Sequence, residues 1–105
     1  MTKKTNSLNH IFELQKALND RCGVKSEKIQ KKEKKISKWV LNYTRAYSQE
    51  FAELQDSLPW RWWDKDHKYD PQNAKVEIID LFHSDISLCQ VTGMSSEKLT
   101  ENIDT

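Results

Sequence analysis

The chain has 105 residues and a formal net charge of +1, so it is long enough for one domain, and its overall charge identifies no partner. Charged residues make up 31% of it and the mean hydropathy is −0.87, which fits long solvated helix faces. No apolar run approaches the roughly 20 residues of a membrane helix, and no signal core follows the basic N-terminus. We therefore expect a cytoplasmic protein with a flexible segment at residues 1–6 and a single domain at residues 7–105. The two cysteines, Cys22 and Cys89, are too few for a disulfide framework, and both are expected to be free.

The first predicted helix covers residues 8–21. Ser7 is its expected N-cap, and Gly23 is a natural stop signal. Residues 23–33 then form a charged connector. The apolar stripe expected on this helix consists of Ile11, Leu14 and Leu18, with Phe12 beside it.

Two longer helices follow. The second is predicted at residues 34–57, because Pro59 disfavours helical backbone just before it. The third has Asp70 as N-cap and Pro71 as its first residue, it continues to about Val91, and Gly93 is its stop signal. The predicted apolar stripes are Ile36, Val40, Tyr43, Tyr47 and Leu54 on the second helix, and Val76, Ile79, Phe82, Ile86 and Cys89 on the third.

A last short helix is predicted between its cap, Ser95, and the end of the chain. Only two glycines and two prolines interrupt the sequence, which favours helices over sheets. The predicted fold is all-α, a bundle of three main helices plus a short C-terminal helix. Because so short a chain buries a modest core, we expect a homodimer to complete the bundle.

Four carboxylates interrupt the apolar stripes. Glu50 falls where the stripe of the second helix should continue, and Glu53 shares its face three residues on. Glu77 and Asp80 repeat this spacing on the third helix. If the two helices pack antiparallel, these groups converge and repel one another, and a divalent cation would relieve that conflict. Ligation by oxygen alone favours Mg²⁺, or Mn²⁺, over zinc.

Two other interpretations remain open from the residues alone. Acidic pairs at this spacing are also common on solvated helix faces. Separately, residues 25–38 hold seven lysines and two glutamates, next to Trp39 and Tyr43, which is a pattern that could bind nucleic acid through phosphate contacts. The interleaved glutamates and the near-zero net charge favour a solvated linker instead, so nucleic acid is disfavoured as a partner.

The acidic motifs carry a resemblance to a known family. The pattern E-x-x-E at Glu50 and Glu53, followed by E-x-x-D at Glu77 and Asp80, resembles the all-α NTP pyrophosphatase superfamily. Within it the sequence is most similar to the dimeric dUTPases, over about residues 10–100. The segments that carry this similarity are residues 14–20 (LQKALND), 53–57 (ELQDS), 60–63 (WRWW) and 76–83 (VEIIDLFH).

This resemblance implies a Mg²⁺-dependent enzyme. The four carboxylates would hold two or three Mg²⁺ ions that clamp the phosphates of dUTP or dUDP. A water oriented by Glu50 or Glu53 would then attack and release dUMP. Gln15 and Asn19 would read the uracil, because each carboxamide offers a donor and an acceptor on one helix face. Without the family match, both would be ordinary exposed helix residues.

The tryptophan run would contribute to the substrate site. The resemblance implies that Trp60, Trp62 and Trp63 wall the base and sugar, although at least one of them is expected in the core. Arg61 and Lys65 would meet phosphates. The family usually has a lysine directly after the last tryptophan, and here Lys65 would substitute for it one position later.

Two departures from the family bear on activity. Ser84 and Asp85 stand where the family usually has apolar residues. The family also continues beyond the region of residues 93–99 into a helix whose lysines and asparagines close over the phosphates, whereas this sequence stops at Thr105. The resemblance therefore implies weakened hydrolysis, or alternatively a catalytically impaired binding or regulatory protein.

Overall fold

The computed structural model describes residues 7–104, and this part of the chain is all-α, as predicted. Its helices are α1 (Ser7–Arg21), α2 (Ser26–Ile29), α3 (Glu33–Asp56), α4 (Pro71–Val91) and α5 (Ser96–Ile103). The predicted bounds of the three long helices are correct to within one residue. The flexible segment expected at residues 1–6 lies outside the described residues, as does Thr105.

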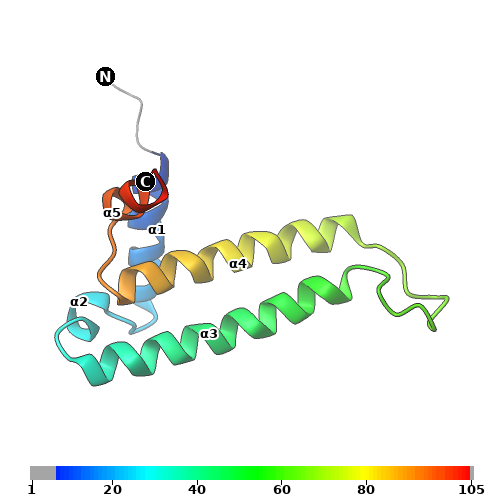
Figure 1. The fold of residues 1–105 in the computed structure, drawn as a ribbon, viewed down its shortest axis with the longest axis horizontal. Helices are drawn as coiled ribbons and strands as arrows, with labels where there is room; N and C mark the ends of the chain where they lie inside the picture. Colours follow the sequence, from blue (N-terminus) through cyan, green and yellow to red (C-terminus); the bar gives the residue numbers. More distant parts are fainter. Residues whose placement is uncertain (1–6, 105) are drawn as a thin grey trace.

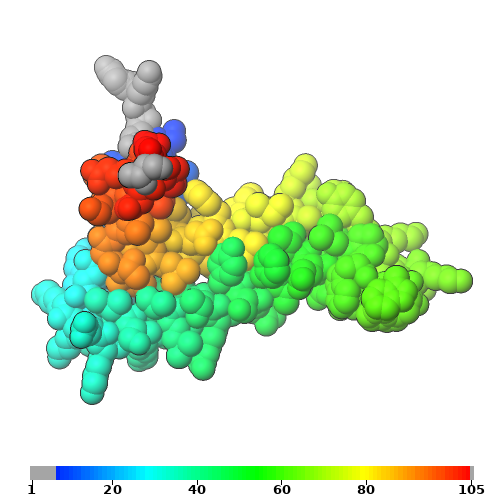
Figure 2. Space-filling model, in the orientation of Figure 1, coloured from blue at the N-terminus to red at the C-terminus, as the bar shows by residue number. Residues whose placement is uncertain are grey.

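A helical hairpin dominates the molecule. α3 and α4 run antiparallel along most of their length (Figure 1). α1 crosses α4 toward the C-terminal end of that helix, and α5 returns beside α1 (Figure 1). The other end of the hairpin and its connecting loop project from this body (Figure 2). Within residues 7–104, no helix combines the length and apolar character that crossing a bilayer requires.

The base of the α3–α4 loop is closed by hydrogen bonds. The Asp70 carboxylate caps α4 by accepting from the backbone N–H of Asn73 at 3.0 Å, which confirms the predicted cap. The Asp70 N–H donates to the carbonyl oxygen of Ser57 at 2.8 Å, and the Asn73 side-chain amide donates to the Ser57 hydroxyl at 2.6 Å. Ser57 is buried, so the two helices are joined at the point where the loop leaves them.

Glycines end α1 and α4 as predicted. Gly93 has φ +84°, the left-handed conformation that side chains with a Cβ rarely adopt. Its N–H donates to the carbonyl of Gln90 at 3.1 Å, and the next N–H, of Met94, donates to that of Cys89 at 2.8 Å. This pair of bonds is a Schellman motif, and it satisfies carbonyls that the helix leaves free. Gly23 has φ +87° and ends α1 in the same way.

The predicted connector contains a structural element that the sequence analysis missed. Residues 26–29 form the single turn α2, and Ile29 at its end is buried. α2 contacts both α3 and α4, so the connector is folded against the hairpin.

The apolar faces differ from the predicted ones. The buried apolar residues are few: Phe12, Ile29, Ala74, Leu81, Ile86 and Val91. α3 has no fully buried residue. The predicted stripes on α1 and α4 are wrong as core faces, because most of their residues are exposed, namely Leu14, Leu18, Val76, Ile79 and Phe82. α4 buries the polar Ser84 as well as Leu81 and Ile86, and the residues of the stripe predicted on α3 are all half-buried.

The Asp70 cap can be tested by removing it. Asp70→Ala should lower the free energy of unfolding by about 1 kcal/mol, because the first turn of α4 loses a partner for its N–H groups. In a domain of this size that loss corresponds to a melting temperature about 4–8 °C lower. Urea titration followed by circular dichroism measures it. Asp66→Ala removes the same charge from the same loop without touching the cap, and an equal loss in both variants would contradict the assignment.

Candidate functional site

The four predicted carboxylates lie on one seam of the hairpin. Glu50 and Glu53 are on α3, Glu77 and Asp80 are on α4, and all four are half-buried. The pKa of Glu77 is raised above its ordinary value, first by desolvation and then by repulsion from Glu53, Asp80 and Glu50. Its Oε2 atom is buried and has no hydrogen-bond partner among the described residues. Glu77 therefore lies near enough to the other three carboxylates to be repelled by each of them.

The carboxylates are not gathered into a coordination shell. Within residues 7–104, no three side chains of histidine, cysteine, aspartate or glutamate are close enough together to hold a metal ion. The repulsion at Glu77 does not require the carboxylates to be that close. Coulomb repulsion between two carboxylates acts over distances much longer than the roughly 2.0–2.1 Å of a Mg²⁺–oxygen bond. The donor set still fits a hard divalent cation, since all of its atoms are oxygens and one of them is buried without a partner.

A serine that the sequence analysis left outside the site orients one of the carboxylates. The Ser84 hydroxyl, buried on α4, donates to Glu50 Oε1 across the seam at 2.5 Å. Ser84 lies seven residues after Glu77, so both share a helix face. The seven-residue spacing from Glu77 could have indicated from the sequence that Ser84 faces the carboxylates. The sequence analysis interpreted Ser84 only as a polar residue at a position that is usually apolar in the family.

The predicted base-reading pair sits in a polar chain between α1 and α4. The buried Gln15 donates from Nε2 to Asn19 Oδ1 at 3.0 Å, and Asn19 donates from Nδ2 to the Ser87 hydroxyl at 3.1 Å. The His83 ring donates from Nδ1 to Gln15 Oε1 at 2.5 Å. These contacts fix which end of each carboxamide is the acceptor. The expectation that Gln15 would be an ordinary exposed residue without the family role is therefore wrong.

The same polar chain reaches α3. Burial raises the pKa of the Tyr43 phenol, and a hydrogen bond with Ser87 partly opposes that shift. His83 and Ser87 were not predicted as site residues. They lie one turn apart on α4, but their contacts are made to residues 68 positions away, which no local pattern reveals.

The tryptophan run forms an exposed aromatic cluster. Trp60, Trp62 and Trp63 are 48%, 83% and 59% exposed, so the expectation that at least one would be in the core is wrong. Their rings pack edge to face on one another, with Trp60 and Trp63 centroids 5.7 Å apart and Trp62 and Trp63 centroids 4.6 Å apart. The Arg61 guanidinium lies 4.7 Å from the Trp60 ring centroid, and Lys65 is exposed. Within residues 7–104, none of the three tryptophans is therefore enclosed by the fold.

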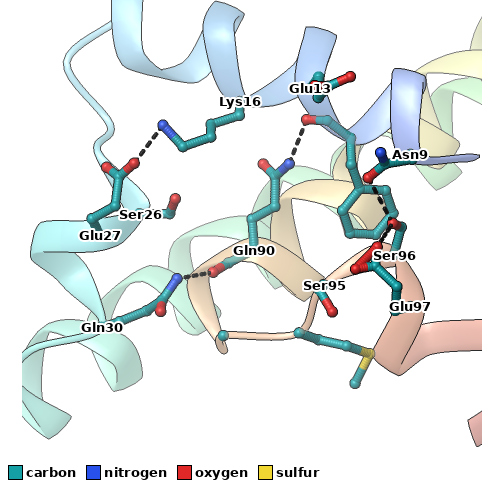
Figure 3. Close-up of a pocket in the computed structure, with 13 residues that line it drawn as sticks. Asn9, Glu13, Lys16, Ser26, Glu27, Gln30, Gln90, Ser95, Ser96 and Glu97 are labelled. Carbon is teal, nitrogen blue, oxygen red and sulfur yellow. Dashed lines mark hydrogen bonds and ion pairs between the residues drawn. The ribbon is translucent and has the colours of Figure 1, made fainter. Parts of the chain in front are cut away.

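A separate cavity of about 290 Å³ opens where α1, α2, α4 and α5 meet (Figure 3). The buried Gln90 crosses it and donates from Nε2 to the carbonyl of Phe12 at 2.7 Å, while Gln30 donates to the carbonyl of Gln90 at 2.7 Å. An ion pair between Lys16 and Glu27 joins α1 to α2 at its edge (Figure 3). None of the predicted site residues lines this cavity, so its contacts serve to hold the helices together.

Comparison with known proteins identifies the family. The family model described as dUTPase matches residues 7–105, which is nearly the whole chain. No curated protein and no solved structure matches it. The matched region contains the acidic quartet, the carboxamide pair and the tryptophan run, and its helical fold agrees with that expected from the resemblance. The chain therefore belongs to the all-α dUTPase family and is a hydrolase of the dUTP diphosphatase type.

Proposed function

We propose that this protein hydrolyses dUTP or dUDP to dUMP with Mg²⁺ held by Glu50, Glu53, Glu77 and Asp80. The observation that supports this most directly is the state of Glu77. A carboxylate that is desolvated, repelled by three neighbours and left with an unpartnered buried oxygen is unfavourable without a cation. Bound Mg²⁺ would neutralise the phosphates and supply Lewis-acid stabilisation of the developing charge.

The two glutamates of α3 have different roles in this proposal. Glu50 is held by the Ser84 hydroxyl, so one of its oxygens is oriented before any ligand arrives. The Glu53 carboxylate accepts no hydrogen bond from the described residues, although it lies close enough to repel Glu77. Glu53 is therefore the residue free to orient the attacking water and accept its proton.

Base recognition is proposed for the carboxamide pair. The contacts with His83 and Ser87 use one donor or acceptor of each amide, and each amide retains a further N–H and a further lone pair. Uracil presents acceptors and a donor along one edge, which these groups can satisfy. Trp60, Trp63 and Lys65 lie on the exposed loop and would form an outer wall of the site.

A second candidate is a nucleotide-binding protein with little turnover. No lysine or arginine forms an ion pair with the acidic quartet within residues 7–104. Gln15 is also occupied by internal partners at both ends of its amide. Such a protein would bind a deoxyuridine nucleotide with Mg²⁺ and release no product.

We also propose that two copies pair through the outer face of the hairpin. α4 exposes Val76, Ile78, Ile79 and Phe82, and α3 exposes Leu41 and Phe51. Apolar surface of this extent is uncommon on a monomer and marks an interaction face. A second hairpin would bury it and complete a bundle around the polar seam.

Mg²⁺ binding can be measured as a gain in thermal stability. Mg²⁺ at about 100 times its dissociation constant should stabilise the wild-type protein by about 2.7 kcal/mol, since it binds only the folded quartet. Glu50→Gln and Asp80→Asn should each reduce that gain, and each should stabilise the metal-free protein by removing a repelling charge. Scanning calorimetry with and without EDTA measures both effects. An identical Mg²⁺ response in all three proteins would exclude a metal site at the quartet.

Hydrolysis is tested by product release. With Mg²⁺, the wild type should release pyrophosphate from dUTP, or phosphate from dUDP, and Glu53→Gln should lower kcat by about 10²-fold or more, as loss of a transition-state contact does. Glu13→Gln on α1 is the matched control and should leave kcat unchanged. Tight binding of a non-hydrolysable dUTP analogue without turnover would instead support the nucleotide-binding candidate, and neither binding nor turnover would contradict both.

Dimer formation can be tested by measuring the molar mass of the protein in solution. Light scattering at micromolar concentration should give a dimer, and Phe82→Glu should shift it to the monomer, because a charge in a buried apolar face is costly. Lys75→Glu changes the charge of α4 by a larger amount than Phe82→Glu without altering its apolar face, and should remain dimeric. A wild-type monomer mass would contradict the proposal.

A further inference from the structure

The lysine-rich segment folds into a basic cavity. Lys25 and Lys28 come from the start of α2 and from α2 itself, and Lys35 and Lys38 come from the first turns of α3. Together with Trp39 they line a cavity of about 390 Å³ at the end of the hairpin where α2 meets α3. A volume of this size lies within the usual range of small-molecule sites.

The fold brings these side chains together for local reasons. The buried Ile29 anchors α2 against the hairpin, and the turn after it reverses the chain into α3. Lys35, Lys38 and Trp39 share one face of α3, because residues three and four apart are neighbours on a helix. Lys28 on α2 faces the same space.

No acidic side chain neutralises this cavity. The segment contains two glutamates, but Glu27 pairs with Lys16 of α1 and Glu33 lines a different hollow. Within residues 7–104, the ion pairs include none of the four lysines that line the cavity. The interleaving of lysines and glutamates seen in the sequence therefore does not carry over to the surface, where four lysines and no acidic residue line one cavity.

The cavity also has an aromatic wall. The Lys38 ammonium lies 5.9 Å from the Trp39 ring centroid, and the Trp39 and Tyr43 rings are 5.9 Å apart and tilted by 42°. An aromatic ring beside several cations can contact the flat or apolar part of a ligand whose charged part meets the lysines.

From these contacts we infer that the cavity between α2 and the start of α3 is a binding site for a di- or triphosphate anion, free or carried by a nucleotide. Such an anion bears several negative charges within a few ångströms, which matches four lysines with no carboxylate among them. The site is distinct from the acidic quartet, because Lys38 and Glu50 are twelve positions apart on one helix, or about 18 Å at 1.5 Å per residue. It therefore does not depend on the proposed hydrolysis.

The test is calorimetric titration of the full chain with inorganic tripolyphosphate in EDTA, which removes any contribution from a metal at the quartet. We expect one-to-one binding that weakens as salt rises. Lys28→Gln with Lys35→Gln should weaken binding at least tenfold, which is about 1.4 kcal/mol. Lys31→Gln with Lys34→Gln is the matched control, because it removes the same charge from the same segment but not from the cavity, and it should weaken binding less than about threefold.

Comparing the affinities of several ligands shows whether the bound anion is a free polyphosphate or the phosphate chain of a nucleotide. Tighter binding of ATP than of tripolyphosphate, with no binding of adenosine, identifies a nucleotide held by its phosphates and by Trp39. Equal affinity identifies a free polyphosphate. The proposal is overturned if tripolyphosphate does not bind, or if both lysine pairs weaken binding equally. A third outcome also overturns it: a single-stranded oligonucleotide binds more tightly than tripolyphosphate or ATP, and both double lysine variants weaken its binding equally. That result would identify an extended nucleic-acid surface.

Discussion

The polar seam between α3 and α4 is the constraint on which the rest of the structure depends. Two packed helices ordinarily bury apolar side chains along their contact, but here Glu50, Glu77 and Ser84 occupy it. Carboxylates in such a position are partly desolvated and repel one another, as the raised pKa of Glu77 records. Part of the apolar stripe of α4, namely Val76, Ile79 and Phe82, is exposed. The proposed cation site and the proposed pairing face thus both follow from carboxylates that interrupt apolar stripes.

The helix ends could be predicted because their chemistry is local. Asp70 and Pro71 start α4, Gly93 ends it and Ser95 caps α5, and each acts through backbone groups within five positions. The shared face of each acidic pair could also be predicted. A spacing of three puts both carboxylates of a pair on one face of their helix, but the distance between the pairs depends on how the two helices are aligned, and within residues 7–104 they do not gather into a metal-binding group.

The burial of each face could not be predicted from this chain alone. Apolar periodicity shows that a stripe exists on a helix, but not whether the stripe meets its own chain or another molecule. The partners of Gln15 and Glu50 were missed for a related reason, since His83 and Ser84 lie 68 and 34 positions away from them. The turn α2 was missed because a single turn has too few residues to show periodicity, and it is held by the burial of Ser26 and Ile29 and by the ion pair of Glu27 with Lys16 of α1.

Hydrogen bonds close the base of the α3–α4 loop, so the register of the two helices does not depend on the rest of the loop. Because Ser57, Asp70 and Asn73 bond directly to one another, the position of α4 against α3 does not depend on how many residues lie between them. Doubling the length of a flexible loop costs only about 0.6 kcal/mol. A change in the length of the loop should therefore leave the alignment of the carboxylates undisturbed, even where it displaces the tryptophan run. The alignment of the acidic pairs and the placement of Trp60, Trp63 and Lys65 are thus separate properties of the hairpin.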